Sequence, residues 1–215
     1  MVADRSRSSV TSGNPGSPGS PGGPGARRRV GLLGGTFDPV HVGHLIVAES
    51  VREKLGLTQL RLLVAGDPWM KDQESPAEHR VAMARAAVAS NPAITVDDRE
   101  TRRDGPTYTA ETLAQLHAEE PDVDWTFLVG ADAAARLPDW HDIDQALELA
   151  AFVVVARPGS SLPNHDLMDR VTVVSAPMVE VSSTQVRADV AAGRSIRHRV
   201  PEVVIHHIRG NVLYR

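Results

Sequence analysis

The sequence predicts an α/β fold, a doubly wound and mostly parallel sheet, because strand-like and helix-like segments alternate along nearly the whole chain. The strand-like segments are short runs of Val, Leu, Ile and Phe, which is typical of parallel strands buried on both faces. Pro, Gly and Asn separate the segments, and no internal repeat is visible. A length of 215 residues suits one such domain with an appendage.

The first half of the chain is expected to hold three strands, each followed by a helix. The first helix begins at about Gly43, repeats apolar residues at helical spacing and ends at Gly56. The second begins at a capping box of Ser75 and Glu78, with Pro76 at the first helical position. The expected strands are residues 30–33, 60–64 and 94–96, and the expected helices are residues 43–55, 76–90 and 109–118.

The second half continues the alternation with shorter elements. The apolar run at 152–156 is its clearest buried strand. Ser183 is expected to cap a helix that ends at Gly193, and a last helix starts at Pro201. The other expected elements are strands at 125–129 and 171–174 and short helices at 131–136 and 143–149.

The N-terminal part of the chain differs in composition from the rest. Residues 13–27 repeat glycine at every third position, mostly with proline, but these triplets are too few for a collagen-like triple helix. We therefore expect a flexible, partly extended tail at 1–28 and a single domain at 29–215. Residues 1–29 carry a net charge of +4 against −8 for the remainder, so that contact of the tail with an acidic partner is the alternative.

Composition excludes several classes of function. The chain has no cysteine, which excludes disulfides, thiolate metal sites, iron–sulfur clusters and a cysteine nucleophile. No apolar run approaches the roughly 18 residues of a membrane span, and no secretory signal is visible. The net charge of −4 gives no support to nucleic-acid binding. We expect a cytoplasmic protein without nucleic-acid or membrane partners; a homo-oligomer is compatible with the sequence.

The loop after the first expected strand has the features of a phosphate-binding site. Gly34 and Gly35 allow backbone N–H groups to approach an anion, and the helix from Gly43 directs its positive end to the same place. His41 and His44 are three residues apart, so that both can face one ligand. There is no P-loop or dinucleotide-binding fingerprint. A turn with two surface histidines, or half of a metal site, is the alternative.

Two further segments have a pattern that suits a nucleotide. If Ser183 caps its helix, N–H groups and hydroxyls converge there, and Arg187 lies one turn along the same face. Gly130 and Asp132 follow a strand, where a carboxylate can accept a ribose hydroxyl. The alternatives are an ordinary capped helix with a surface arginine and an aspartate that caps a helix.

The loop string GGTFDPVHVGHL, at 34–45, resembles the nucleotidyltransferase motif whose core is [HT]-x-G-H. In this form it is similar to the loop of nicotinate-nucleotide adenylyltransferases, enzymes of NAD biosynthesis. The similarity covers nearly all of 29–215 and implies their Rossmann-like nucleotidyltransferase fold. Its other segments are SPAEHRVAM (75–83), GPTYTAETL (105–113), FLVGADAAARLPDW (127–140), VEVSSTQVR (179–187) and VPEVVIHHIRGNVLYR (200–215).

The resemblance implies a reaction and a place for ATP. A phosphate oxygen of nicotinate mononucleotide would attack the α-phosphorus of ATP, with Mg²⁺ bound mainly by the ATP phosphates and without a covalent enzyme intermediate. His41, His44 and Arg187 would bind phosphates and stabilise the transition state. Asp38 would order the loop, approach a metal or simply start a turn. The other ATP-binding residues implied are Gly34, Gly35, Thr36, Phe37, Gly43, Gly130, Asp132, Ser182, Ser183 and Thr184.

The resemblance also assigns residues to nicotinate mononucleotide. Trp140 would stack on the pyridine ring, and the segment Thr107, Tyr108 and Thr109 would bind its carboxylate through helix-start amides. Where many family members carry a Pro-Pro-His-Lys segment, this chain retains only Lys71 as a phosphate ligand. The alternatives are aromatic side chains in the core and a plain surface lysine.

Other interpretations stay open from the residues. The acceptor of the same chemistry could be nicotinamide mononucleotide or phosphopantetheine, and a non-catalytic nucleotide-binding module is the alternative of another class. His79 and Arg80 either reach the site or face solvent from a helix. The remaining histidines are expected to be surface or structural: His117, His141, His165, His198, His206 and His207.

Overall fold

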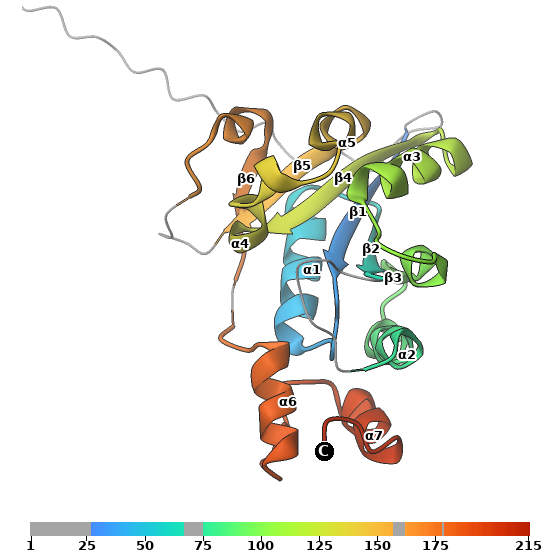
Figure 1. Ribbon diagram of the computed structural model, residues 1–215, viewed down its shortest axis with the longest axis vertical. Coiled ribbons are helices and arrows are strands. Elements are labelled where there is room, and N and C mark those ends of the chain that lie inside the picture. Colours follow the sequence, from blue (N-terminus) through green and yellow to red (C-terminus); the bar gives the residue numbers. More distant parts are fainter. Residues whose placement is uncertain (1–26, 67–74, 157–161, 178) are drawn as a thin grey trace, which may run out of the picture.

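A computed structural model describes residues 27–66, 75–156, 162–177 and 179–215. Its centre is one parallel six-stranded sheet with the strand order β3-β2-β1-β4-β5-β6 (Figure 1). This order confirms the predicted doubly wound fold. The strands are β1 (Arg28–Gly35), β2 (Gln59–Val64), β3 (Ile94–Asp97), β4 (Val123–Gly130), β5 (Ala151–Ala156) and β6 (Thr172–Ser175).

The helices agree with the expected ones to within a few residues, and short 3₁₀ turns add to them. The α-helices are α1 (Val42–Lys54), α2 (Ala77–Val88), α3 (Thr109–Glu119), α4 (Ala131–Ala134), α5 (Ile143–Leu149), α6 (Ser183–Ala191) and α7 (Glu202–Gly210). The 3₁₀ turns are η1 (Arg99–Arg102), η2 (Leu137–Asp139) and η3 (Asp166–Arg170). The part of the chain that the structure describes holds no helix long and apolar enough to cross a lipid bilayer.

Two hydrophobic cores lie on the two faces of the sheet. One includes Val51 of α1, Met83 of α2 and Ile205 of α7. The other includes Leu113 of α3 and Ala146 of α5. Because β1 lies between β2 and β4, the chain winds away from β1 in both directions, and a crevice opens at the carboxyl ends of β1 and β4.

Two expected helix caps are wrong. Helix α2 begins at Ala77 with no side-chain cap, and the N–H of Ser75 instead donates to Asp38 Oδ2 at 3.1 Å. Helix α6 is capped by Ser182, whose Oγ accepts from the N–H of Gln185 at 3.2 Å. The backbone N–H of Ser75 and the hydroxyl of Ser183, which donates to the carbonyl oxygen of Pro39 at 2.9 Å, each contact the loop after β1 instead.

Candidate functional site

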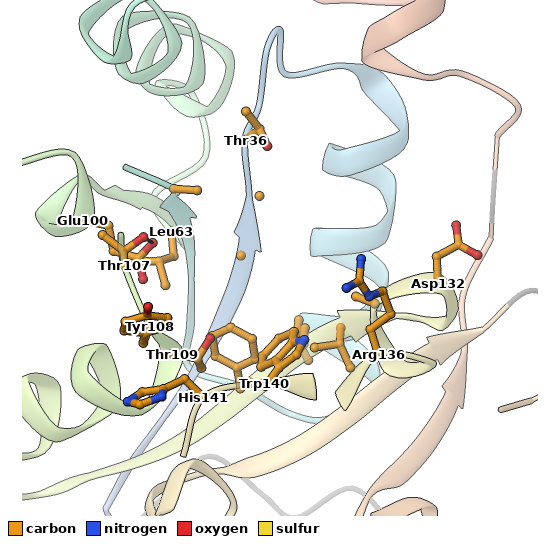
Figure 2. A pocket seen from close by; sticks show the side chains of 17 residues that line it. Thr36, Leu63, Glu100, Thr107, Tyr108, Thr109, Asp132, Arg136, Trp140 and His141 are labelled. Carbon is orange, nitrogen blue, oxygen red and sulfur yellow. Dashed lines mark hydrogen bonds between the residues drawn. The ribbon is translucent and has the colours of Figure 1, made fainter. Parts of the chain in front are cut away.

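A cavity of about 350 Å³ occupies the crevice at the carboxyl ends of β1 and β4 (Figure 2). Gly34 and Gly35 of β1 form one wall, and the start of α3 and the segment after α4 form others. The polar and aromatic side chains that line it are Thr36, Glu100, Thr107, Tyr108, Thr109, Phe127, Asp132, Arg136, Trp140 and His141.

Aromatic rings form one side of this cavity. The ring centroids of Tyr108 and His141 lie 4.4 Å apart at 39°. Trp140 meets Phe127 edge-on, with centroids 6.0 Å apart at 88°. Since Phe127 belongs to the core of β4, the indole is held from behind and presents a flat apolar surface to a ligand.

A buried carboxyl group, Glu100, lies at the far end of the same cavity. Its oxygens accept from the hydroxyl of Thr112 at 2.7 Å and from that of Thr107 at 3.3 Å. Burial raises the pKa of Glu100, and these hydrogen bonds together with Arg103 partly oppose the shift. Glu100 therefore fixes the turn that leads into α3, where Thr107, Tyr108 and Thr109 border the cavity.

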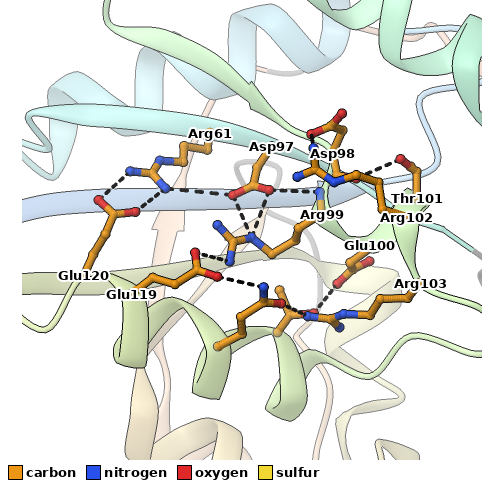
Figure 3. Close-up of polar contacts among 12 residues, drawn as sticks. Arg61, Asp97, Asp98, Arg99, Glu100, Thr101, Arg102, Arg103, Glu119 and Glu120 are labelled. Carbon is orange, nitrogen blue, oxygen red and sulfur yellow. Dashed lines mark hydrogen bonds and ion pairs between the residues drawn. The ribbon is translucent and has the colours of Figure 1, made fainter.

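A network of ion pairs holds η1, the turn that carries Glu100, against β2, β3 and α3 (Figure 3). Arg99 Nε donates to Asp97 Oδ1 at 2.9 Å, and its Nη1 lies 2.9 Å from Glu119 Oε2. Arg61 binds Glu120 with both terminal nitrogens, at 2.6 and 2.9 Å. These half-buried pairs explain how a short turn keeps one carboxyl group at a fixed place in the cavity.

Substitution of Glu100 by Met should weaken binding of the substrate that contacts the turn at Thr107. The variant keeps a similar shape but removes both acceptors, at about 1 kcal/mol per lost hydrogen bond. We expect KM for the ligand that contacts this turn to rise about fivefold, with little change in KM for a substrate bound at the loop after β1. Steady-state kinetics with each substrate varied in turn measures this. Thr112→Val, which removes a Glu100 partner outside the cavity, is the matched control; equal KM values for Glu100→Met and wild type would contradict the prediction.

The loop after β1 carries the two predicted histidines side by side. The rings of His41 and His44 stack at 3.7 Å between centroids, and His44 meets the edge of Phe37 at 4.9 Å. The backbone N–H of His41 donates to Nδ1 of His44 at 3.2 Å. Because Nδ1 of His44 accepts, the hydrogen of its neutral ring is assigned to Nε2, the nitrogen that can donate to a phosphate oxygen.

Helix α1 starts one residue earlier than expected, at Val42, with His41 as the N-cap residue. Burial lowers the pKa of His41 to about 4, so that this ring is neutral at pH 7. A Cβ on Gly43 would lie 3.0 Å from His41 Nδ1, and glycine therefore lets the ring fold back on the helix. The N–H of Val42 donates to the carbonyl of Arg199 at 2.9 Å, which removes one of the helix-end donors expected for phosphate.

Arg187 reaches the same loop from α6. Its Nη1 donates to the carbonyl oxygen of Asp38 at 2.8 Å. The hydroxyl of Ser183 donates to the carbonyl oxygen of Pro39 at 2.9 Å. The structure thus brings His41, His44 and Arg187 to one loop, and this loop enters the cavity with Gly34, Gly35 and Thr36.

Arg80 is neither a site residue nor on a solvated face. Its side chain is 0% exposed, and its guanidinium donates to the carbonyl oxygens of Thr36 at 3.0 Å, Ala65 at 2.7 Å and Gly66 at 3.1 Å. It therefore ties the loop after β1 to the loop after β2, directly behind the cavity.

Comparison with known proteins places this geometry in a family. Residues 32–189 match the family pattern described as Cytidylyltransferase-like. The chain is 43% identical over 192 residues to a probable nicotinate-nucleotide adenylyltransferase of Saccharopolyspora erythraea, covering 88% of this chain and 91% of that protein. A protein of the same description from Leifsonia xyli is 41% identical over 195 residues, with 88% and 96% covered. The chain belongs to the nicotinate-nucleotide adenylyltransferase family.

Solved structures agree on the fold of the enzyme. Plasmodium falciparum nicotinic acid mononucleotide adenylyltransferase complexed with NaAD superposes with a TM-score of 0.74 at 17% identity, covering 87% of this chain and 97% of that one. A putative nicotinate-nucleotide adenylyltransferase from Vibrio parahaemolyticus gives a TM-score of 0.62 at 18% identity, with 87% and 96% covered.

Most of the predicted site residues of the enzyme gather around the loop and the cavity, and five others need separate description. Phe37 is 1% exposed, and its ring belongs to the core instead of the cavity wall. The hydroxyl of Ser182 caps α6, and the hydroxyl of Ser183 donates to the carbonyl oxygen of Pro39. Thr184 is exposed. Lys71 lies outside the described residues.

The cavity also contains residues that the sequence interpretation missed. His141, expected to be surface or structural, lines it beside Tyr108, and its position directly after Trp140 was the available signal. Glu100 and Arg136 line it as well. The sequence around these two residues gave no indication of a site. The segment of η1 has no strong helix pattern, and Arg136 has the pattern of a surface residue after a short helix.

Proposed function

We propose that this enzyme transfers the adenylyl group of ATP to nicotinate mononucleotide, giving deamido-NAD and pyrophosphate. The observation that carries the proposal is the loop after β1, which holds His41 and His44, is contacted by Arg187 of α6 and leads directly into a cavity walled by aromatic rings. Such an arrangement suits a triphosphate at the loop and a flat ring in the cavity. The reacting phosphate groups then meet near Thr36, where the loop and the cavity join.

The chain's residues position the phosphates and stabilise charge. A phosphate oxygen of the mononucleotide attacks the α-phosphorus, the bond to the pyrophosphate oxygen breaks, and pyrophosphate leaves with the electron pair. His44 donates from Nε2 to a phosphate oxygen, and Arg187 supplies a fixed positive charge from α6. Backbone N–H groups of the glycine pair contact the nucleotide at close range, and Asp132, which lines the cavity, borders its ribose together with Gly130 two residues earlier.

The pyridine ring stacks against Trp140, with Tyr108 and His141 beside it. The helix-start amides at Thr107 and Thr109 receive the ring carboxylate. Arg136 also lines the cavity, and its positive charge favours binding of the anionic mononucleotide. Lys71 is assigned to the mononucleotide phosphate on the family resemblance.

ATP enters as its magnesium complex, with the ion held mainly by the phosphates. Asp38 does not fit a role as a metal ligand, because its two oxygens accept from Tyr214 and Ser75. Its role is to order the loop. We further assign catalysis to residues 29–215 in the cytoplasm and treat residues 1–28 as an appendage.

A two-substrate assay tests the proposed function. Purified protein with Mg²⁺ should release pyrophosphate when ATP and nicotinate mononucleotide are both present, and EDTA should stop the release. Nicotinamide mononucleotide and phosphopantetheine, supplied at the same concentration, should give a kcat/KM at least about tenfold lower. Absence of release from folded protein that binds ATP would support the alternative of a non-catalytic nucleotide-binding module instead.

A further inference from the structure

The last residues of the chain adopt an unusual backbone after α7 ends beside α2 (Figure 1). Val212 has φ = 55° and Tyr214 has φ = 63°, a region that costs non-glycine residues about 1 kcal/mol or more. A β-branched residue such as Val212 is rarely found there. Leu213 and Tyr214 pack against the hydrophobic core, and the N–H of Leu213 donates to the carbonyl of Ile208 at 3.0 Å. The surrounding contacts therefore impose this conformation on the chain end.

The conformation brings the side chain of Tyr214 to the loop after β1. Its hydroxyl donates to Asp38 Oδ1 at 2.5 Å, although 176 residues separate the two in sequence. Asp38 is 2% exposed, and its other oxygen accepts from the N–H of Ser75. Burial, together with the bond to Asp38, raises the pKa of Tyr214, so that the hydroxyl keeps its proton and acts as the donor.

Asp38 is one of the residues that connect the loop to the rest of the molecule. Its carbonyl oxygen accepts from Arg187, and the carbonyl oxygen of the next residue, Pro39, accepts from Ser183. His41 follows two residues later and caps α1. A displacement of the Asp38 carboxylate would therefore be transmitted along the backbone to His41 and across the hydrogen bond to Arg187.

We propose that Tyr214 is a positioning residue for adenylyl transfer, whose hydroxyl holds Asp38 and thereby sets the places of His41, His44 and Arg187. The inference rests on the proposed function, since it assumes that these three side chains act on the phosphates. Tyr214 touches no substrate in this scheme. Tyr214 lies near the end of the chain, so the loop after β1 is fully ordered only when the C-terminal segment has folded.

The variant Tyr214→Phe tests the proposal, because it keeps the ring in the core and removes only the hydroxyl. We expect kcat to fall about tenfold or more, since misplacement of a positioned group by about 1 Å can cost up to about 100-fold. KM for nicotinate mononucleotide should stay within about twofold, because Tyr214 is not among the residues that line the cavity. Leu213→Ala is the matched control; it loses packing on the same core and should keep the wild-type kcat despite a lower melting temperature.

Two further measurements separate positioning from simple stabilisation. In an Asp38→Asn background, Tyr214→Phe should cause no additional loss of kcat. The ring signals of His44 in ¹H–¹³C NMR spectra, assigned with His44→Ala, should shift in Tyr214→Phe and not in Leu213→Ala. The NMR comparison decides the question even if Asp38→Asn does not fold or the wild type fails the two-substrate assay, because it does not depend on activity. Unchanged kcat with unchanged His44 signals in Tyr214→Phe, or equal effects of Tyr214→Phe and Leu213→Ala, would overturn the proposal.

Discussion

Replacement of His44 by alanine should lower kcat for adenylyl transfer about 100- to 1000-fold, the usual loss for one donor aimed at transition-state charge. The ring donates from Nε2, because Nδ1 is occupied by the N–H of His41. His44 is only partly buried, so the free energy of unfolding should change by no more than about 1 kcal/mol. Steady-state pyrophosphate release and thermal unfolding of the same preparation measure both quantities.

His206→Ala is the matched control for this prediction. That histidine lies on α7, its side chain is 70% exposed, and its nearest carboxylate is Glu202 at 3.6 Å. Both kinetic constants should equal those of the wild type. If His44→Ala retained wild-type turnover, the assignment of the loop to the triphosphate would be wrong, whatever the substrate of the enzyme.

Replacement of Arg80 by methionine should cause the largest loss of stability. The change leaves the carbonyl oxygens of Thr36, Ala65 and Gly66 without their donor in a region closed to water. It also removes the positive charge that acts on buried Asp38. Each buried carbonyl oxygen left without a donor costs about 1–3 kcal/mol, and we expect a fall of about 3–5 kcal/mol in the free energy of unfolding measured with denaturant.

Arg85→Met, on the same helix, is the control for Arg80→Met. Its guanidinium pairs with Asp98 at 3.0 Å, but the side chain is 57% exposed. Such a surface pair contributes little, so the control should lie within about 0.5 kcal/mol of the wild type. A loss below about 1 kcal/mol in Arg80→Met would mean that water or a neighbouring group replaces the lost donors.

Local patterns were sufficient for the elements and for the selection of the loop after β1 as a candidate phosphate site. Apolar runs marked the strands because parallel strands are buried on both faces, and Gly56 and Gly193 ended helices because each adopts a positive φ. The pair of histidines was visible because the two lie three positions apart at a helix start. The caps at Ser75 and Ser183 were misjudged, since each serine contacts the loop after β1 instead.

The sequence by itself therefore determined the order of strands and helices, the family, and the residues that we assign to the phosphates. Only the tertiary structure decided which polar side chains are buried or line the cavity. The sequence left Arg80 open between the site and a solvated helix face, Glu100 had no signal of its own, and Tyr214 lay at the far end of the chain from Asp38. The physical reason is that capping and periodicity act between near neighbours in sequence. The partner of a buried charge or hydroxyl is set by which loops the sheet brings together, and no short-range pattern encodes that.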